Sequence, residues 1–361
     1  MSQPRQIRYL FFFVHPAKYH LFRETINALL KSGSTVDVVI VTKDVLEELV
    51  QHEGWSYTNI FPEGRRMRGL PIVVGTAINF VRTLWRLHRY VRNRSYDVFV
   101  TDDCLSILGR FHRIPTYFFM DNDIETVPEA SLLLRAAHWV LAPRGVKLGR
   151  AQHKALYFDG YKELAYLHPN YFQPDSQAVT RLAGSGPFVI IRTVSMTASH
   201  DRGIHGLSDA QVRKLCQLIA PVAQVFISSE RVLPADLNRL RLRVKPWEIS
   251  DVMSSALLFI GDSGTMASEA AVLGVPSIFY HAFVGRLQVM EEKETHYGLM
   301  FNFHTTQFDA LLSKVEQLLS IPDLKAQWRI RADRMLSEKE DVTKFILDCL
   351  QSKGQALDAA A

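Results

Sequence analysis

At 361 residues, with 47% hydrophobic and 22% charged residues, the chain has the composition of a soluble globular protein and enough length for two domains. Lysine and arginine outnumber the acids by only 42 to 37, which does not indicate a nucleic-acid-binding protein. The cysteines Cys104, Cys216 and Cys349 are widely separated, which excludes a disulfide framework or a cysteine metal cluster and favours a reducing cytoplasm. No apolar run approaches the ~18 residues of a membrane-spanning helix.

The first half of the chain begins with a strand–helix–strand pattern. Residues 7–14 and 36–41 read as buried strands on either side of a helical stretch, which is the opening of a Rossmann-like domain. His15 and His20 follow the first strand, at the edge where such sheets bind ligands, although a loop histidine is more often only a turn residue. This segment contains no G-x-G-x-x-G motif, which argues against a dinucleotide redox cofactor.

Acidic side chains follow two further predicted strands, at residues 97–101 and 116–119. These acids are Asp102, Asp103, Asp121 and Asp123. At a strand end they could act as a general base toward a hydroxyl group. The spacing of Asp121 and Asp123 is also that of a metal-binding D-x-D, which is a weak signal here. Turn formation and helix capping are the competing explanation for these acids.

Residues 64–95 are rich in arginine and contain no acid. The arginines are Arg65, Arg66, Arg68, Arg82, Arg86, Arg89, Arg92 and Arg94. From Thr76 onward the pattern predicts a helix with one apolar and one basic face. The basic face is either simply solvated, as in a crossover helix, or attaches the chain to an anionic membrane surface, with Phe80 and Trp85 at the interface.

Linker composition appears once, at residues 169–187, which are rich in proline, glycine and polar residues. We therefore expect a first domain at 1–168 and a second at 188–336. Arg192 ends the first predicted strand of the second domain, and a basic, hydroxyl-rich loop that contains His200 follows it. A last helix, at 337–354, is expected to pack back on the first domain.

The stretch 257–281 contains the strongest signal in the chain. A short apolar strand at 257–260 is followed by a turn of small residues, a helix at 265–273 and a second apolar strand at 277–280. The start of such a helix carries free N–H groups and the positive end of the helix dipole, which suits a diphosphate. Glu269, one turn further on, could accept hydrogen bonds from a ribose. Alternatively, Gly261 and Gly264 only form a tight turn.

This stretch resembles the nucleotide-binding segment of GT-B glycosyltransferases and of UDP-N-acetylglucosamine 2-epimerases. It is most similar to the DUF354 family of predicted glycosyltransferases, with the pattern GGTM-x-x-EAA-x-LG-x-P. The matching residues are Gly264, Thr265, Met266, Glu269, Ala270, Ala271, Leu273, Gly274 and Pro276, whereas Asp262 and Ser263 stand where glycines are usual. The segments around His15 and His20, and around Lys162 and Glu163, match other parts of the family pattern.

The resemblance implies an α/β protein of the GT-B fold, with two Rossmann-like doubly wound domains that face a cleft. It implies a UDP-linked nucleotide-sugar substrate and no metal or other cofactor. The expected donor-binding residues are Arg192, His200, Ser228, Ser229, Trp247, Asp262, Ser263, Gly264, Thr265, Met266 and Glu269. The expected acceptor-side residues are His20, Lys162, Glu163 and His281, and the base is one of Asp102, Asp103, Asp121, Asp123 and His15.

The predicted function is metal-independent transfer of a sugar to a glycan or lipid-linked acceptor in surface polysaccharide biosynthesis, in the cytoplasm or at the inner face of the cell membrane. An epimerase-like nucleotide-sugar enzyme is the first alternative, with acids from Asp102, Asp121, Glu125 and Glu129 and with His200 in comparable places. A non-catalytic nucleotide-sugar binder at a membrane surface is the second.

Overall fold

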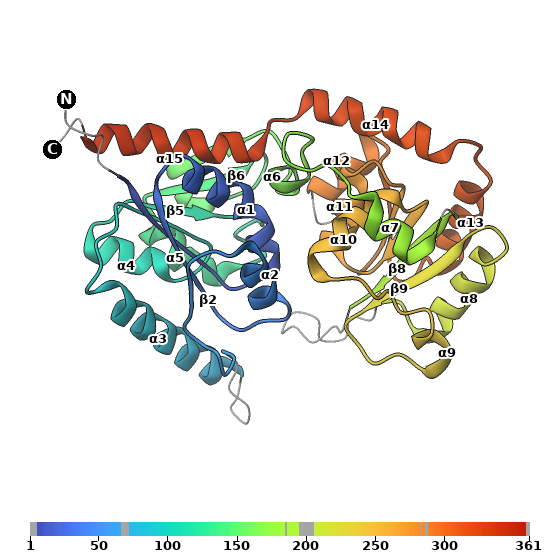
Figure 1. Cartoon of the computed structure of the whole chain (residues 1–361), viewed down its shortest axis with the longest axis horizontal. Helices are drawn as coiled ribbons and strands as arrows, with labels where there is room; N and C mark the ends of the chain where they lie inside the picture. Colours follow the sequence, from blue (N-terminus) through green and yellow to red (C-terminus); the bar gives the residue numbers. More distant parts are fainter. Residues whose placement is uncertain are drawn as a thin grey trace. The chain divides into compact units, whose positions relative to one another are not determined.

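The computed structural model describes residues 6–65, 72–184, 186–194, 206–282, 284–285 and 288–358, without the side chains of 72–73 and 353–358. The chain divides into two compact units. Unit 1 comprises residues 1–166 and 340–361, and unit 2 comprises residues 167–339. Figure 1 shows that the last part of the chain, in red, returns to unit 1 after completing unit 2.

Unit 1 is built on a parallel sheet of seven strands in the order β3-β2-β1-β4-β5-β6-β7. The strands are β1 (Arg8–Phe13), β2 (Thr35–Ile40), β3 (Tyr57–Asn59), β4 (Val98–Thr101), β5 (Thr116–Phe119), β6 (Trp139–Pro143) and β7 (Ala155–Phe158). Strand β1 is a continuous apolar run whose residues from Tyr9 onward are fully buried. A central parallel strand is covered by helices on both faces, so the alternation of apolar and polar residues disappears.

Helices cover both faces of this sheet (Figure 1). On one face α1 contacts α2 and α15, and on the other α4 contacts α3 and α5. The helices are α1 (Pro16–Lys31), α2 (Leu46–Glu53), α3 (Ile72–Val91), α4 (Leu105–His112), α5 (Ser131–Ala136), α6 (Leu164–Leu167) and α15 (Val342–Asp358), with 3-10 turns η1 (Pro128–Ala130) and η2 (Gly149–Lys154). Helix α15 is anchored where the Tyr117 hydroxyl donates to the Cys349 carbonyl at 2.8 Å.

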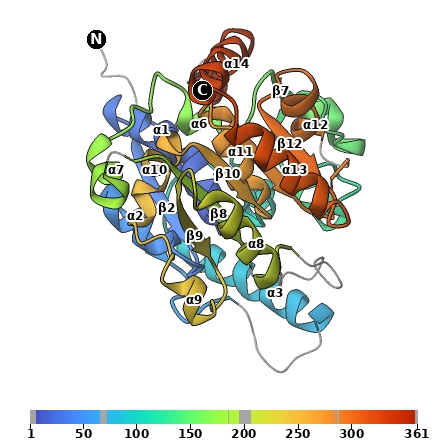
Figure 2. The ribbon, with the colours of Figure 1, turned by 90° about the vertical axis from the view of Figure 1, so that its right-hand side faces the viewer.

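Unit 2 contains a parallel sheet of five strands in the order β12-β11-β10-β8-β9. The strands are β8 (Phe188–Thr193), β9 (Gln224–Ser229), β10 (Leu258–Gly261), β11 (Ser277–Tyr280) and β12 (Met300–Phe303). Its helices are α7 (Ser176–Ala183), α8 (Asp209–Ile219), α9 (Ala235–Asn238), α10 (Ile249–Ser255), α11 (Gly264–Val272), α12 (Gln288–Thr295), α13 (Phe308–Leu319) and α14 (Leu324–Glu338), with a 3-10 turn η3 (Pro246–Glu248). Helix α8 packs beside α13, as Figure 2 shows, and α11 contacts α10 and α14.

The strand–turn–helix–strand stretch predicted at 257–281 forms the centre of unit 2. Helix α11 connects β10 to β11, and its residues from Ala267 to the end are buried. Gly274 ends the connection with a φ of +74°, a conformation that a residue with a side chain rarely adopts. A Cβ at this position would also lie 3.1 Å from the Ala332 Cβ on α14. Both units are therefore α/β with parallel, Rossmann-like sheets, as the sequence predicts. None of the helices in the described part of the chain is long and apolar enough to cross a membrane.

Candidate functional site

In unit 2 the order of the strands changes direction between β8 and β10. The chain passes from β8 outward to β9 and then returns to place β10 on the other side of β8. Open parallel sheets bind ligands outside the carboxyl ends of their strands at such a switch point. Gly261 at the end of β10 pairs with Arg192 near the end of β8. The turn after β10 and the side chain of Arg192 therefore belong to one edge of the sheet.

The last residue of β10 has to be a glycine. A Cβ added to Gly261 would lie 2.8 Å from the Cβ of Arg192 and 3.1 Å from its carbonyl oxygen. Because non-bonded carbon atoms do not pack this closely, any side chain would push β8 and β10 apart. The glycine predicted as a turn former thus has a second role, which is to let the strand end approach Arg192.

The N-terminus of α11 offers hydrogen-bond donors. Ser263 is the N-cap, and its hydroxyl accepts from the Met266 N–H at 3.5 Å. The N–H groups of Gly264 and Thr265 have no acceptor within the described residues. Residues 263–266 are partly exposed, so these amides are at the surface of unit 2. Free amides at the positive end of a helix dipole attract anions, and this end of α11 can bind a phosphate group.

Arg192 is held by two neighbours, and its Nε–H group is not used by any described residue. One terminal nitrogen donates to the Ser228 hydroxyl at 2.8 Å, and the other is paired with Glu230. Its Nε is shielded from solvent and has no hydrogen-bond partner in the described part of the chain. A buried donor without an acceptor is unfavourable, so an anionic oxygen that accepted from Nε would be stabilised. Ser228 acts here by orienting Arg192.

The sequence predicts that Asp262 binds the donor, but in the structure its side chain is hydrogen-bonded within unit 2. Its side chain is only 3% exposed, and its two carboxylate oxygens accept from the Val194 N–H at 2.8 Å and from the Leu207 N–H at 3.0 Å. Burial raises the pKa of Asp262 to about 6, against the opposing effect of these two hydrogen bonds. A carboxylate would also repel a diphosphate. Asp262 therefore fixes the ends of the loop after β8, and the adjacent amides remain the candidates for phosphate binding.

Ser229 is also engaged within the protein. Its hydroxyl lies 2.9 Å from the Thr193 hydroxyl, donates to the Arg231 carbonyl at 3.0 Å and accepts from the Arg231 N–H at 3.1 Å. These bonds join β8 to the turn after β9. Ser229 therefore stabilises the edge that carries Arg192, rather than offering a free hydroxyl to a ligand.

The remaining predicted site residues of unit 2 differ in their burial and contacts. Trp247 is in η3, where the ring faces the Lys245 ammonium at 5.5 Å. Glu269 is buried within α11. His281, predicted on the acceptor side, belongs to unit 2 and stacks on Phe279 with ring centroids 5.4 Å apart. His200 and the loop around it lie outside the described residues.

In unit 1 the predicted acids at the ends of β4 and β5 have different environments. The Lys18 ammonium lies 3.2 Å from one carboxylate oxygen of Asp121, and the Lys162 ammonium lies 2.8 Å from the other. Burial opposes ionisation of Asp121, but the two ammonium groups outweigh it and hold the pKa well below its usual range. A carboxylate in this state binds a proton poorly. Asp121 is therefore a poor general base, and it fixes Lys162 and Lys18 at the sheet edge.

Asp102 has the opposite properties. Its Oδ1 is shielded from solvent and has no hydrogen-bond partner among the described residues. Burial raises the pKa of Asp102 to about 7; Lys18 opposes the rise, and Asp103 and Asp121 add to it. Strand β4 follows β1 at the switch point of the unit 1 sheet, which places Asp102 at the edge where ligands bind. A carboxyl group that titrates near neutral pH can accept and return a proton.

Asp103 and Asp123 have structural roles. Asp103 forms a two-pronged pair with Arg65, with oxygen–nitrogen distances of 2.7 and 3.4 Å, and accepts from the Cys104 N–H at the start of α4. Asp123 accepts from the Lys147 N–H at 2.7 Å and so joins two loops. Both carboxylates are thus engaged within the protein. The turn and capping explanation holds for both.

The two predicted histidines of unit 1, His15 and His20, have different environments. His15 is exposed and caps α1, because its Nδ1 accepts from the Ala17 N–H at 3.1 Å. His20 lies between the rings of Tyr19 and Tyr166, with centroids at 4.9 and 5.1 Å. Burial, helped by Arg23 and His15, lowers the pKa of His20 to about 3, so its ring is neutral. Glu163, expected on the acceptor side, is buried with 3% exposure.

Sequence reasoning missed Lys18. Its side chain is 13% exposed, and its ammonium lies 4.5 Å from the centroid of the Phe119 ring while it binds Asp121. A lysine at the start of a helix carries no distinguishing spacing, and only the position of α1 after β1 could have indicated that it reaches the sheet edge. Across the described residues, no group of three or more His, Cys, Asp or Glu side chains is arranged to hold a metal ion.

Solved structures with a similar fold cover nearly the whole chain. A putative UDP-N-acetylglucosamine 2-epimerase from Listeria monocytogenes superposes with a TM-score of 0.67 at 12% identity, covering 97% of each chain. The spinosyn forosaminyltransferase SpnP superposes with a TM-score of 0.63 at 16% identity, covering 97% of this chain and all of its own. The calicheamicin glycosyltransferase CalG4 has a TM-score of 0.60 at 14% identity, covering 97% of this chain and 98% of its own.

These likenesses establish the fold, which is that of GT-B glycosyltransferases and of the 2-epimerases. No protein-family model matches the sequence, and no curated protein matches it by sequence. The resemblance to DUF354 therefore rests on the residues of the sequence alone.

Proposed function

We propose that this protein is a glycosyltransferase that moves a sugar from a nucleotide-sugar donor, UDP-linked, to a hydroxyl group of an acceptor. The observation that carries the proposal is the anion site of unit 2. It combines the free Gly264 and Thr265 amides of α11 with the unsatisfied Nε of Arg192 on the adjoining strand. Hydrogen-bond donors from a helix start and a guanidinium group suit a diphosphate.

In the proposed reaction, the oxygen of the acceptor forms a bond to the anomeric carbon of the sugar. The bond from that carbon to the diphosphate breaks, and the nucleoside diphosphate leaves with the bonding electrons. Negative charge therefore grows on the diphosphate, where the α11 amides, the helix dipole and Arg192 stabilise it in the transition state. This stabilisation comes from groups of the protein and needs no metal ion.

The proton of the acceptor hydroxyl goes to a base, for which we choose Asp102. Its raised pKa, about 7, gives it both a populated basic form and a useful affinity for a proton at neutral pH. Its Oδ1 has no competing hydrogen bond within the described residues. Asp121 lacks both properties, since two lysines occupy its oxygens. Lys18 and Lys162, held by Asp121, lie at the same edge of unit 1 and would position an acceptor there.

The acceptor and the cellular setting are the least constrained parts of the proposal. A lipid-linked or polysaccharide acceptor in surface glycan synthesis follows from the family resemblance. Placement in the cytoplasm, or on the inner face of the cell membrane, fits the scattered cysteines. The membrane contact depends on a separate part of unit 1 and is argued below.

An epimerase activity on a UDP-linked N-acetyl sugar is the second candidate. It is favoured by the similar fold of a putative UDP-N-acetylglucosamine 2-epimerase, and by Asp102, whose carboxylate form near neutral pH could remove a proton from carbon as well as from oxygen. The two candidates share the anion site of unit 2. They differ in whether a second substrate, the acceptor, is required.

The experiment has a binding step and a reaction step. Thermal unfolding of the full chain is measured with UDP, dTDP, UDP-N-acetylglucosamine, uridine and inorganic phosphate. We expect the diphosphates to raise the midpoint and uridine to leave it unchanged, because binding to the folded state stabilises it. No shift with any diphosphate would contradict the anion site.

The reaction step then uses the nucleotide sugar that binds best, with and without glycan or lipid-linked acceptors. A sugar transferred only when acceptor is present supports the glycosyltransferase. An isomerised sugar and free UDP formed without acceptor would reject it in favour of the epimerase. Nucleotide-sugar binding with neither product would reject both and leave the binding protein.

A further inference from the structure

Exposed apolar side chains gather on one part of unit 1. Of the 11 large hydrophobic side chains exposed in the described part of the chain, five lie on α3 and at the end of α4. They are Val74, Ile78, Val81, Trp85 and Phe111. Scattered single apolar residues are ordinary on a protein surface, but a contiguous group indicates an interaction site. We refer to these five residues as the α3 face.

The four members on α3 form a stripe along the helix. Positions 74, 78, 81 and 85 recur every three or four residues, which places them on one side of a helix. The opposite side, with Leu87 and Val91, packs into the core of unit 1. Helix α3 is thus apolar on two sides, and its outer side is not covered by the described residues of unit 1: Val81 is 63% exposed and Trp85 is 57% exposed.

Phe111 extends this surface onto α4. It is 73% exposed, and its ring contacts His88 of α3 at a centroid distance of 6.3 Å. The same His88 stacks on His112 at 5.4 Å, which joins the two helices. Trp85 on α3 and Phe111 on α4 are therefore two exposed aromatic side chains on neighbouring helices. Aromatic side chains of this kind prefer the boundary between a membrane and water.

The arginines near this face fall into two groups. Arg82 and Arg86 are paired with Glu63 at 3.2 and 2.6 Å and lie over the Phe61 ring. Arg89, Arg92 and Arg94, toward the end of α3, have no acidic partner within the described residues. The arginines without an acidic partner are therefore confined to the end of α3, a shorter segment than the basic region predicted over residues 64–95. Arg65 binds Asp103 at the sheet edge, and Arg66 and Arg68 lie outside the described residues.

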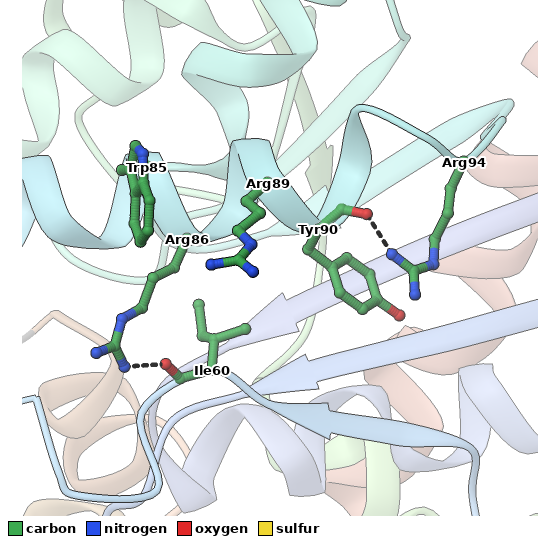
Figure 3. Close-up of a pocket in the computed structure, with 6 residues that line it drawn as sticks. All are labelled: Ile60, Trp85, Arg86, Arg89, Tyr90 and Arg94. Carbon is green, nitrogen blue, oxygen red and sulfur yellow. Dashed lines mark hydrogen bonds between the residues drawn. The ribbon is translucent and has the colours of Figure 1, made fainter.

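A pocket of about 450 Å³ lies next to the α3 face. It is lined by Ile60, Trp85, Arg86, Arg89, Tyr90 and Arg94. Figure 3 shows the guanidinium of Arg89 pointing into this pocket between Arg86 and Tyr90, with no hydrogen bond drawn to it. Arg86 is bound to the Ile60 carbonyl and Arg94 to the Tyr90 carbonyl, so both are held in place (Figure 3). Three guanidinium groups around an open pocket suit a phosphate group.

We propose that the α3 face docks unit 1 on an anionic membrane. The apolar stripe and Phe111 enter the interfacial layer, and the pocket beside Trp85 receives the phosphate of a lipid headgroup. A second copy of this chain fits less well, because two α3 faces in a two-fold interface would bring Arg89, Arg92 and Arg94 near the same arginines of the other copy, while Glu63 is already paired. This inference extends the proposed function and does not depend on it.

The test uses the full chain and sedimentation with vesicles. One vesicle set is pure phosphatidylcholine, and the other contains one third phosphatidylglycerol. We expect binding to the anionic set only. The double variant Arg89→Glu and Arg92→Glu should weaken that binding by at least about 30-fold, since each surface arginine contributes roughly a factor of five. The variant Trp85→Ala with Val81→Ser should weaken it as well, through loss of apolar insertion.

Matched controls lie in unit 2. Val232→Ser changes a side chain that is 93% exposed, and Arg239→Glu reverses an exposed charge at the end of α9. Both should bind vesicles like the unmodified protein. Trp85 also reports its own position, because lipids with brominated acyl chains should quench part of the tryptophan fluorescence, and Trp85→Phe should abolish that part.

Three results would overturn the inference. The first is equal binding to neutral and anionic vesicles, and the second is vesicle binding that the α3 variants do not change. The third is absence of vesicle binding together with dimers in analytical ultracentrifugation that Trp85→Ala with Val81→Ser dissociates. That last result would assign the α3 face to a second copy of the chain. Circular dichroism melts confirm that each variant is folded.

Discussion

Both sheets of the molecule are parallel and have one point where the strand order reverses, but the chemistry at their carboxyl edges differs. In unit 1 the strand ends carry acids, and Asp102 and Asp121 follow β4 and β5. In unit 2 the corresponding edge carries the guanidinium of Arg192 and the first amides of α11. One edge can accept a proton and the other can hold an anion. A doubly wound sheet fixes where a ligand binds, and the residues at that edge decide which chemistry takes place.

A second contrast concerns two aspartates at these edges. Burial raises the pKa of both, to about 7 for Asp102 and to about 6 for Asp262. Asp262 uses both oxygens to accept backbone N–H groups, whereas Oδ1 of Asp102 has no partner within the described residues. A shifted pKa therefore does not identify a catalytic group by itself. The hydrogen-bond partners separate the aspartate that holds a loop from the one that is free to take a proton.

The largest effect that we expect from this contrast is on catalysis. Asp102→Asn removes the proposed base and should lower kcat by about 10³-fold, within the range usual for general base catalysis. In the unmodified protein, kcat/KM should rise with pH through about 7 and then level off, because the deprotonated Asp102 is the active form. Steady-state rates from pH 5 to 9 measure both. Glu48→Gln, which removes an exposed acid of α2, is the control. A variant as active as the unmodified enzyme would remove Asp102 from the mechanism.

The next effect is on stability and concerns Asp262. Asp262→Ala leaves the Val194 and Leu207 N–H groups without acceptors and should lower the unfolding free energy by about 3 kcal/mol. Asp262→Asn keeps one acceptor oxygen and should lose about half as much. Urea titration monitored by circular dichroism measures the loss. If Asp262→Ala proved as stable as the unmodified protein, the distinction between the two aspartates would fail.

A third and smaller effect tests the amides of α11. Gly264→Pro removes one N–H group at the first position of the helix, where proline is well tolerated and where the extended Ser263 suits a following proline. Gly264→Ala adds a similar Cβ, which would meet the flexible Met290 side chain at 3.3 Å, but keeps the N–H. We expect the proline variant to bind UDP about 10- to 100-fold more weakly than the alanine variant, by calorimetry. Equal affinities would show that this amide does not contact the phosphates.

The fold could be predicted because its signals are local. The apolar strands β1 and β10, the turn before α11 and the glycine after it are each set by neighbouring residues. The same holds for the first amides of α11, since the first N–H groups of any helix lack acceptors within that helix. The ends of the predicted strands also indicate which acids lie at the carboxyl edge of the unit 1 sheet. This part of the site needed no knowledge of distant contacts.

The roles of the individual acids depend on partners far away in the sequence. Asp262 bonds to N–H groups 55 and 68 residues before it, and Asp121 is bound by Lys18, which precedes it by 103 residues. Arg65 belongs to the arginine-rich segment 64–95, yet its side chain binds Asp103, 38 residues later. No spacing rule relates these positions. The sequence could therefore indicate the edge, whereas the free carboxylate had to be found in three dimensions.

The last effect is a pH-dependent gain in stability from Asp102→Asn. The pKa of Asp102 is raised from 3.8 to about 7, so the folded protein binds an extra proton between these values and loses stability as the pH rises through them. Each pKa unit of the shift corresponds to about 1.4 kcal/mol of this loss. Asparagine carries no charge, so the variant should match the unmodified protein at pH 4 and exceed it by up to about 4 kcal/mol at pH 8. Urea unfolding of both proteins at the two pH values measures this difference, in which other titrating groups cancel. A gain at pH 8 together with a loss of rate would mean that the protein keeps an ionised aspartate at a cost in stability because catalysis requires it, and equal stability at pH 8 would contradict the raised pKa.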